Sequence, residues 1–165
     1  MSRTVLLATI LSACLVAPAF GQSVVLVRHA ERADTTAGGA PMMAADPDLS
    51  EPGRARARRL AEMLRDAGIA AIFVTEFKRT QQTAGPLAEV LGLTPVIIKA
   101  AETKTLITRI RAVKGHVLVV GHSNTVPEVA AAIAGAPPIT IADDEYDNLL
   151  VVSRSGKARL VRLRY

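Results

Sequence analysis

Two short apolar runs end abruptly in polar residues and set the pattern of this chain. Residues 24–27 (VVLV) lead into RHAE, and residues 117–120 (VLVV) lead into GHS. Continuous runs of Val and Leu, too short for stable helices, predict strands that are buried on both faces. The carboxyl ends of parallel strands meet at one edge of a sheet, where ligands bind. We therefore expect His29 and His122 to lie close together.

Helical spacing of apolar residues alternates with the predicted strands. Helices are predicted to begin near Ser50, Arg79 and Thr125, with another around residues 106–113. Further strands are predicted over residues 70–74 and 95–99, and residues 149–152 with 158–161 are typical of an antiparallel hairpin. This alternation predicts a single α/β domain over residues 22–165. Its expected architecture is a three-layer sandwich, in which helices cover both faces of a mostly parallel central sheet.

Local signals refine the predicted helices. Ser50 is placed to cap the first helix, and Gly68 is placed to end it. Pro86 falls inside the second helix and predicts a break or a kink there. Thr125 and Glu128 have the spacing of a capping box at the start of the fourth helix.

The N-terminus follows a different pattern. Arg3 precedes an almost continuously apolar stretch over residues 5–16, and small residues follow it. This arrangement predicts a secretory signal peptide over residues 1–21, and therefore a periplasmic or secreted protein with no integral membrane span after its removal. The tetrapeptide LSAC at residues 11–14 resembles a lipoprotein box, so a lipid anchor at Cys14, the single cysteine, is the alternative.

Composition narrows the classes of ligand. The formal net charge is +5, which suits an anionic ligand, but aromatic residues make up only 3% of the chain. Stacking platforms for nucleic acid are therefore lacking, and we expect no nucleic-acid partner. The basic run over residues 54–59 is predicted to be the solvated face of a helix. Residues 32–47 have no period and predict a long loop next to the site.

Four motifs carry a family resemblance. RHAE at residues 28–31 closely resembles the R-H-[GA]-E signature of the histidine phosphatase superfamily, also called phosphoglycerate-mutase-like. LSEPGRA at residues 49–55, FKRTQQTA at 77–84 and VGHSN at 120–124 are similar to the other motifs of the family, in the same order. The resemblance implies a small single-domain phosphatase that hydrolyses a phosphomonoester or a phosphoramidate. It also implies that His29 becomes phosphorylated, with no metal or cofactor.

The chemistry agrees with this resemblance. A histidine nucleophile needs one neutral ring nitrogen aimed at phosphorus, and a backbone acceptor can hold the other nitrogen. Arginine offers planar, paired donors to the phosphate oxygens. The resemblance therefore assigns the phosphate pocket to His29, Arg28, Arg79 and His122. We expect His122 to be an imidazolium when phosphate is bound, and we add Ser123 as a phosphate ligand.

The proton for the leaving group has no clear donor. Glu102 follows the strand predicted at residues 95–99 and is the positional candidate for a general acid. The alternative is that Glu102 only favours the start of the next helix. Without an acid, only good leaving groups would depart, as in phosphohistidine or aryl phosphates. Glu31 is expected to orient an arginine, and the acidic residues of segment 143–147 are expected to form a solvated turn.

Two other functions remain open. One is a non-catalytic envelope protein that binds a phosphorylated ligand in the same pocket. The other is a phosphomutase, although this chain has little length for a lid that would exclude water from the intermediate. The expected partner is a small phosphorylated substrate or a phosphoprotein. Neither the natural substrate nor the oligomeric state follows from the sequence.

Overall fold

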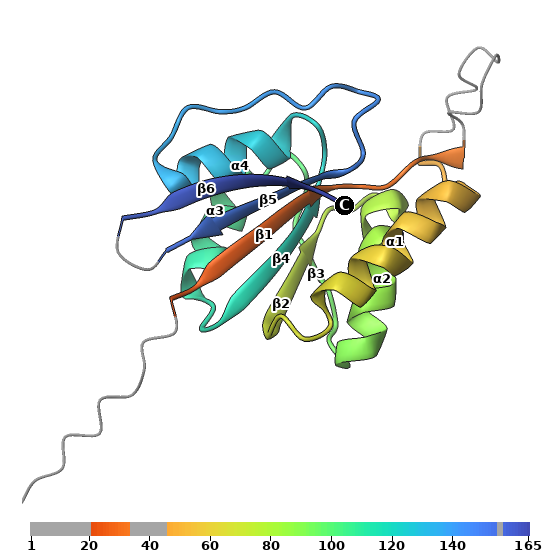
Figure 1. The fold of residues 1–165 in the computed structure, drawn as a ribbon, viewed down its shortest axis with the longest axis horizontal. Helices are drawn as coiled ribbons and strands as arrows, with labels where there is room; N and C mark the ends of the chain where they lie inside the picture. Colours follow the sequence, from red (N-terminus) through yellow and green to blue (C-terminus); the bar gives the residue numbers. More distant parts are fainter. Residues whose placement is uncertain (1–20, 34–45, 155–156) are drawn as a thin grey trace, which may run out of the picture.

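A computed structural model describes residues 21–33, 46–154 and 157–165. Six strands form one sheet in the order β3-β2-β4-β1-β5-β6 (Figure 1). The elements in chain order are β1 (Ser23–Arg28), α1 (Glu51–Leu64), β2 (Ile69–Val74), α2 (Lys78–Leu91), β3 (Val96–Ile97), α3 (Thr103–Ala112), β4 (His116–Gly121), α4 (Thr125–Ala134), β5 (Asn148–Ser153) and β6 (Arg159–Arg164).

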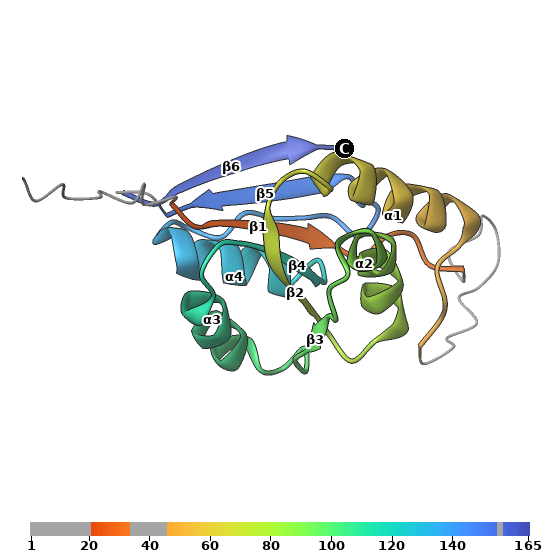
Figure 2. The ribbon, with the colours of Figure 1, turned by 90° about the horizontal axis from the view of Figure 1, so that it is seen from below.

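The sheet is mostly parallel. Strands β3, β2, β4 and β1 run in the same direction, β5 is antiparallel to β1, and β6 is antiparallel to β5. Helices α1 and α2 cover one face of the sheet, and α3 and α4 cover the other (Figure 2). The predicted three-layer α/β sandwich is therefore confirmed, as is the C-terminal hairpin.

Strand β1 shows why continuous apolar runs occur in this sheet. Val24 and Leu26 point into the core beneath α3 and α4, whereas Val25 and Val27 point into the core beneath α1 and α2. Successive side chains of a strand face opposite ways, so a strand covered on both faces needs apolar residues at every position. The same alternation holds in β4, which pairs with β1 along its whole length.

Strands β1 and β4, which precede the two histidines, end where the chain turns away to opposite faces of the sheet. After β1 the chain turns to α1 on one face, and after β4 it turns to α4 on the opposite face (Figures 1 and 2). Neighbouring parallel strands whose connections leave on opposite faces form a crevice at their carboxyl ends. Arg28 lies opposite Gly121 in the register, and the His29 amide donates to the Gly121 carbonyl at 2.9 Å.

Three elements differ from the sequence prediction. Helix α1 ends at Leu64, earlier than predicted, and Gly68 instead takes a positive φ of 65° just before β2. Helix α2 continues unbroken through Pro86. Gly85 explains this continuity, because a residue without Cβ avoids the clash that disfavours helical backbone before proline. Strand β3 has only two residues, both exposed at the edge of the sheet.

The predicted capping box at α4 is wrong. Asn124, not Thr125, is the residue that precedes the helix, and its side chain makes no capping hydrogen bond. The Thr125 hydroxyl instead accepts a hydrogen bond from the backbone amide of His122 at 3.0 Å. The Ser50 cap of α1 is confirmed, since its hydroxyl accepts from the Gly53 amide at 3.1 Å.

Several predictions concern residues outside the described ranges. Nearly all of the predicted signal peptide, including Cys14, lies there, and so does most of the loop predicted over residues 32–47. The signal peptide, the periplasmic or secreted location and the domain boundary at residue 22 therefore stay predictions. Within the described ranges, no helix has the length and apolar character that a membrane span requires.

Candidate active site

His29 follows β1 and is held in one chemical form. Its side chain is buried, and Nδ1 lies 2.8 Å from the carbonyl oxygen of Ala30. Since a carbonyl only accepts, Nδ1 carries the proton, and Nε2 is left with a lone pair. Burial, together with the charges of Arg28, His122 and Arg79, lowers the pKa of His29 to about 3, against the opposing effect of the Ala30 bond. The imidazole is therefore neutral near pH 7.

The Ala30 peptide that holds His29 is itself held by α2. The Ala30 amide donates to the Thr83 hydroxyl at 2.9 Å, and that hydroxyl donates to the Arg79 carbonyl at 2.7 Å. Thr83 is fully buried. The orientation of His29 therefore depends on a threonine in the second arginine motif.

His122 follows β4 and faces His29. The two imidazole centroids are 5.4 Å apart with an edge-to-face geometry. The Nε2 atom of His122 lies 3.1 Å from the Thr75 hydroxyl, at the end of β2. Burial, together with the charges of Arg79 and Arg28, lowers the pKa of His122 to about 4, and Glu76 acts in the opposite direction. The predicted meeting of the two histidines is thus what the structure shows.

Arg28 is buried and fixed by a segment far along the chain. Its Nη1 donates to the carbonyl oxygens of Ala142, at 2.9 Å, and Glu145, at 3.4 Å, and its Cζ lies 4.2 Å from the centre of the Tyr146 ring. Its buried Nε has no hydrogen-bond partner in the described part of the chain. Asp143 and Asp144 do form the predicted exposed turn. The segment has a second role that was not predicted, because the Glu145 carbonyl and the Tyr146 ring contact Arg28.

Arg79 lies in the first turn of α2. Its Cζ stacks 4.2 Å from the centre of the Phe77 ring, and that ring meets His122 edge-to-face at 5.3 Å. Its Nη1 lies 3.7 Å from the Asp46 carboxylate, which also accepts from the Lys78 amide at 3.0 Å. Arg79 and Arg28 thus approach the histidines from different elements, as predicted.

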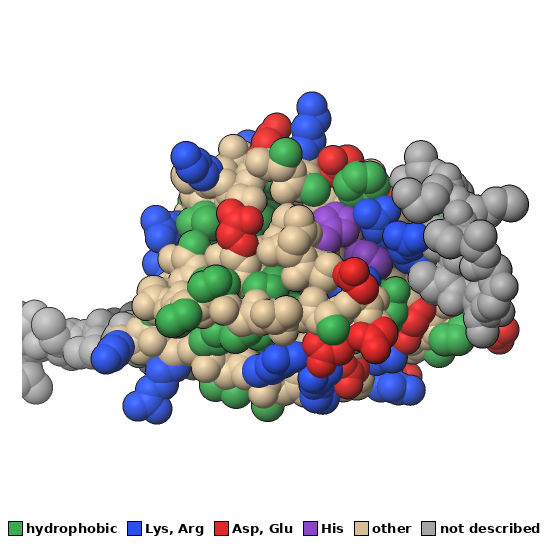
Figure 3. Space-filling view, turned by 90° about the horizontal axis from the view of Figure 1, so that it is seen from above, with side chains coloured by type: hydrophobic (Ala, Val, Ile, Leu, Met, Phe, Trp, Pro, Cys, Tyr) green, Lys and Arg blue, Asp and Glu red, His purple; other side chains and the backbone are tan. Residues whose placement is uncertain are grey.

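Together these groups make a positively polarised cluster. Figure 3 shows histidine side chains reaching the surface in one region, directly beside basic side chains. The cluster combines two neutral imidazoles with two guanidinium groups. Such a set of donors and one free nitrogen lone pair can bind a tetrahedral oxyanion and attack its central atom.

Two predicted site residues lie differently from their expected roles. The Ser123 hydroxyl donates to the Asp143 carboxylate at 3.2 Å. Glu102 is exposed and immediately precedes α3, where its side chain makes no capping hydrogen bond. Glu31 does orient an arginine, because its carboxylate pairs with Arg56 at 2.6 Å. That pair also shows that the run over residues 54–59 is not wholly a solvated face.

Four side chains that shape the site were not predicted from the sequence. Thr75, Phe77 and Thr83 all lie in or beside the second arginine motif, so that motif was the available signal. The fourth, Tyr146, is an aromatic residue inside an acidic segment, where composition pointed to solvent. Each of them acts by holding a histidine or an arginine in place rather than by its own reactivity.

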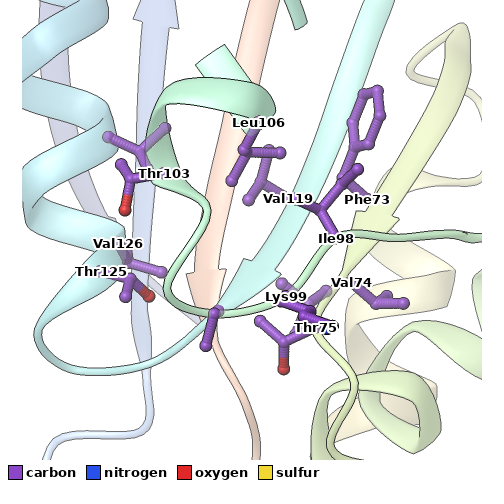
Figure 4. Close-up of a pocket in the computed structure, with 14 residues that line it drawn as sticks. Phe73, Val74, Thr75, Ile98, Lys99, Thr103, Leu106, Val119, Thr125 and Val126 are labelled. Atoms are coloured by element: carbon purple, nitrogen blue, oxygen red, sulfur yellow. The ribbon is translucent and has the colours of Figure 1, made fainter. Parts of the chain in front are cut away.

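A cavity of about 20 Å³ is lined by residues of β2, β4, α3 and α4 (Figure 4). Thr75 and Thr125, which both bond to His122, line it together with apolar residues that include Val119 and Val126. This volume admits about one water molecule. The cavity is therefore a packing feature behind the imidazole and is too small for a substrate.

Comparison with known proteins identifies the family of one segment. The model of the histidine phosphatase superfamily (branch 1) matches residues 24–101, the segment that contains His29, Arg28 and Arg79. This segment belongs to the histidine phosphatase superfamily. His122 lies beyond the matched segment, but the β1–β4 pairing places it against the nucleophile candidate of this superfamily fold.

Solved structures share this superfamily fold. The mycobacterial glucosyl-3-phosphoglycerate phosphatase in complex with VO3 is 17% identical, with a TM-score of 0.68 over 87% of this chain and 98% of that one. The protein histidine phosphatase SixA in complex with tungstate is 19% identical, with a TM-score of 0.67 over 86% of this chain and 96% of that one. At these identities the likeness shows the fold.

One curated relative has higher identity over a shorter segment. The PE-PGRS family protein PE_PGRS11 of Mycobacterium tuberculosis is 39% identical over 85 residues, which is 47% of this chain. The chain spans only 14% of the length of that relative. The similarity is therefore that of one segment within a much longer protein.

Proposed function

We propose that this protein is a phosphatase that hydrolyses a phosphomonoester or a phosphoramidate through a phosphohistidine at His29. The observation that carries the proposal is the hydrogen bond from Nδ1 of His29 to the Ala30 carbonyl, at 2.8 Å. It leaves Nε2 of His29 with a lone pair, in a cluster that also contains Arg28, Arg79 and His122. A nucleophile and the donors that would stabilise the transferring group are thus already in place.

The first step forms the phosphoenzyme. Nε2 of His29 attacks phosphorus, a P–N bond forms, and the bond from phosphorus to the leaving group breaks. Negative charge spreads over the phosphoryl oxygens in this transition state, so fixed guanidinium donors lower its energy. Arg28 is suited to this role because its two carbonyl contacts and the Tyr146 ring immobilise it before the substrate arrives.

The second step returns the free enzyme. Water attacks the phosphoryl group, the P–N bond breaks, and inorganic phosphate leaves with His29 again neutral. The same donors serve both steps, since the charge of the transferring group is the same.

The substrate class follows from the leaving group. Glu102 is exposed before α3, so the site is best suited to substrates whose leaving group departs with little acid assistance. Phosphohistidine and aryl phosphates meet this condition. Similar folds have been solved with tungstate and with VO3, which imitate phosphate, and this supports phosphate binding by a protein of this fold.

The test is hydrolysis of an aryl phosphate by the purified protein, with and without a metal chelator. We expect chelator-resistant turnover that is lost in His29→Ala. His116→Ala is the matched control, because His116 lies at the opposite end of β4 and accepts a hydrogen bond from the Ser23 amide. Well-folded protein that binds phosphate but shows no turnover from acid to neutral pH would contradict the proposal and favour a binding protein.

A further inference from the structure

His122 is held by a hydroxyl, and this makes it chemically different from His29. Its Nε2 lies 3.1 Å from the Thr75 hydroxyl, and its Nδ1 has no hydrogen bond to the described part of the chain. A hydroxyl can donate one hydrogen bond and accept others, whereas a carbonyl can only accept. Nε2 of His122 can therefore exist with or without a proton, while Nδ1 of His29 must keep its proton.

The Thr75 hydroxyl belongs to a buried chain of hydrogen bonds. It lies 2.9 Å from the Thr80 hydroxyl, and Thr80 donates to the Phe77 carbonyl at 2.8 Å. Thr80 is fully buried, and Thr75 is 6% exposed. When Thr80 donates to this carbonyl, the Thr75 hydroxyl can donate to Thr80 and Nε2 of His122 can donate to Thr75. In this direction Nε2 carries the proton, and Nδ1 of the neutral ring keeps a lone pair.

A ring with a free Nδ1 lone pair repels an oxyanion unless it gains a proton. Protonation of Nδ1 turns His122 into an imidazolium with two donors, one for the anion and one for Thr75. Both donors are then satisfied, which is the condition for burying a charged ring. We propose that binding of phosphate at this site is coupled to the uptake of one proton by His122, and that the Thr75–Thr80 hydroxyl pair makes this possible. The inference rests on the proposed function, because it assumes that the cluster of His29, His122 and the two arginines binds phosphate.

The surrounding charges favour His122 over His29 as the group that takes up the proton. Arg79 of α2 and Arg28 of β1 act against protonation of both rings, and each ring is near the other. Among the described residues, a carboxylate acts on His122 but not on His29: that of Glu76 in the β2–α2 connection, which favours the charged form of His122. A bound dianion adds further negative charge beside the ring. His122 therefore becomes the imidazolium first as an anion arrives.

Calorimetry with sulfate tests the coupling directly. Sulfate stays a dianion between pH 5 and 8, so any proton uptake on binding belongs to the protein. Titrations in buffers of different ionisation enthalpy give the number of protons taken up per anion. For the wild-type protein near pH 6 we expect this number to approach one, and we expect the sulfate affinity to fall as the pH rises.

Three variants separate the hydroxyl chain from a general effect on structure. Thr75→Val keeps the shape but removes the acceptor for Nε2, so proton uptake should disappear and sulfate should bind about tenfold more weakly at pH 6. Thr75→Ser should restore both. Thr83→Val removes a fully buried hydroxyl on the His29 side, and it should leave proton uptake intact.

Nitrogen NMR of the ring atoms shows which histidine changes. On addition of sulfate, His122 should take the imidazolium pattern, and His29 should stay neutral with its proton on Nδ1. Sulfate binding without proton uptake, or uptake unchanged in Thr75→Val, would overturn this inference and leave the phosphate pocket standing. Absence of sulfate binding together with absence of aryl phosphate turnover would overturn the proposed function as well.

Discussion

The two histidines of the site are fixed by different kinds of acceptor. A backbone carbonyl holds His29, and a threonine hydroxyl holds His122. The carbonyl permits only one tautomer, which suits a nucleophile that must always present the same lone pair. The hydroxyl permits a change of protonation, which suits a ring that gains a proton when an anion binds. Neighbouring imidazoles can therefore take separate roles according to the hydrogen-bond partner that each one has.

Apart from changes at His29, the largest expected effect comes from Arg28, whose charge acts on both imidazoles. Arg28→Lys should lower kcat/KM by about a hundredfold, because a lysine cannot span two carbonyl contacts and still present a planar donor pair to phosphate. Steady-state kinetics with an aryl phosphate measure this change. Arg109→Lys on the exposed side of α3 is the matched control and should behave like the wild-type protein. Full activity in Arg28→Lys would remove this residue from the phosphate pocket.

The support of His29 is tested by changing Thr83 of α2. Thr83→Val leaves the buried Ala30 amide without an acceptor, which should lower the free energy of unfolding by roughly 1–3 kcal/mol. Denaturant unfolding measures this loss. The rate should also fall because the Ala30 carbonyl no longer holds the imidazole firmly, yet the pH profile should keep its shape. A shifted profile in Thr83→Val with an unchanged profile in Thr75→Val would reverse the roles that we assign to the two threonines.

Acid should weaken the fold through both histidines. In the folded protein the pKa of His29 is lowered to about 3 and that of His122 to about 4, whereas the ordinary value is 6.5. Between these values the unfolded chain binds more protons, so the free energy of unfolding falls as the pH drops from about 6.5 towards 4. Urea titrations at a series of pH values measure this slope. It should be smaller in the His29→Ala and His122→Ala variants, and equal slopes in all three proteins would contradict the depressed pKa values.

The smallest effect is expected at Glu102, the candidate general acid that the sequence suggested. Glu102→Gln should change kcat for an aryl phosphate by less than about twofold, since Glu102 is exposed and surface substitutions of this kind have small effects. The same assay with an alkyl phosphate sharpens the result. A large loss on the alkyl phosphate alone would show that Glu102 reaches the leaving group during catalysis.

The fold and the central pair of histidines were predictable because they follow from local patterns. Continuous apolar runs marked β1 and β4, and the motifs at their ends placed His29 and His122 at one edge of the sheet. What holds these rings was not predictable. Thr75 and Thr83 lie in another segment of the sequence, and their contacts with the rings exist only after the sheet has formed.

Packing likewise overrode local signals at three places. Thr125 had the pattern of a helix cap but bonds to the His122 amide, and Pro86 had the pattern of a helix break but follows a glycine that tolerates the helix. The acidic segment that contains Tyr146 had the composition of a solvated turn. It packs against Arg28 because a buried guanidinium needs carbonyl acceptors, and no local pattern shows which segment supplies them.

Trapping of the phosphoenzyme tests the central claim most directly. The protein would be mixed with an aryl phosphate, quenched within milliseconds in base, digested, and mapped by mass spectrometry. We predict one phosphorylated peptide, which contains residues 28–31, with an acid-labile phosphate on Nε2 of His29 and no such peptide in His29→Ala. Turnover without phosphate on His29, or turnover that persists in His29→Ala, would contradict the proposed phosphohistidine mechanism.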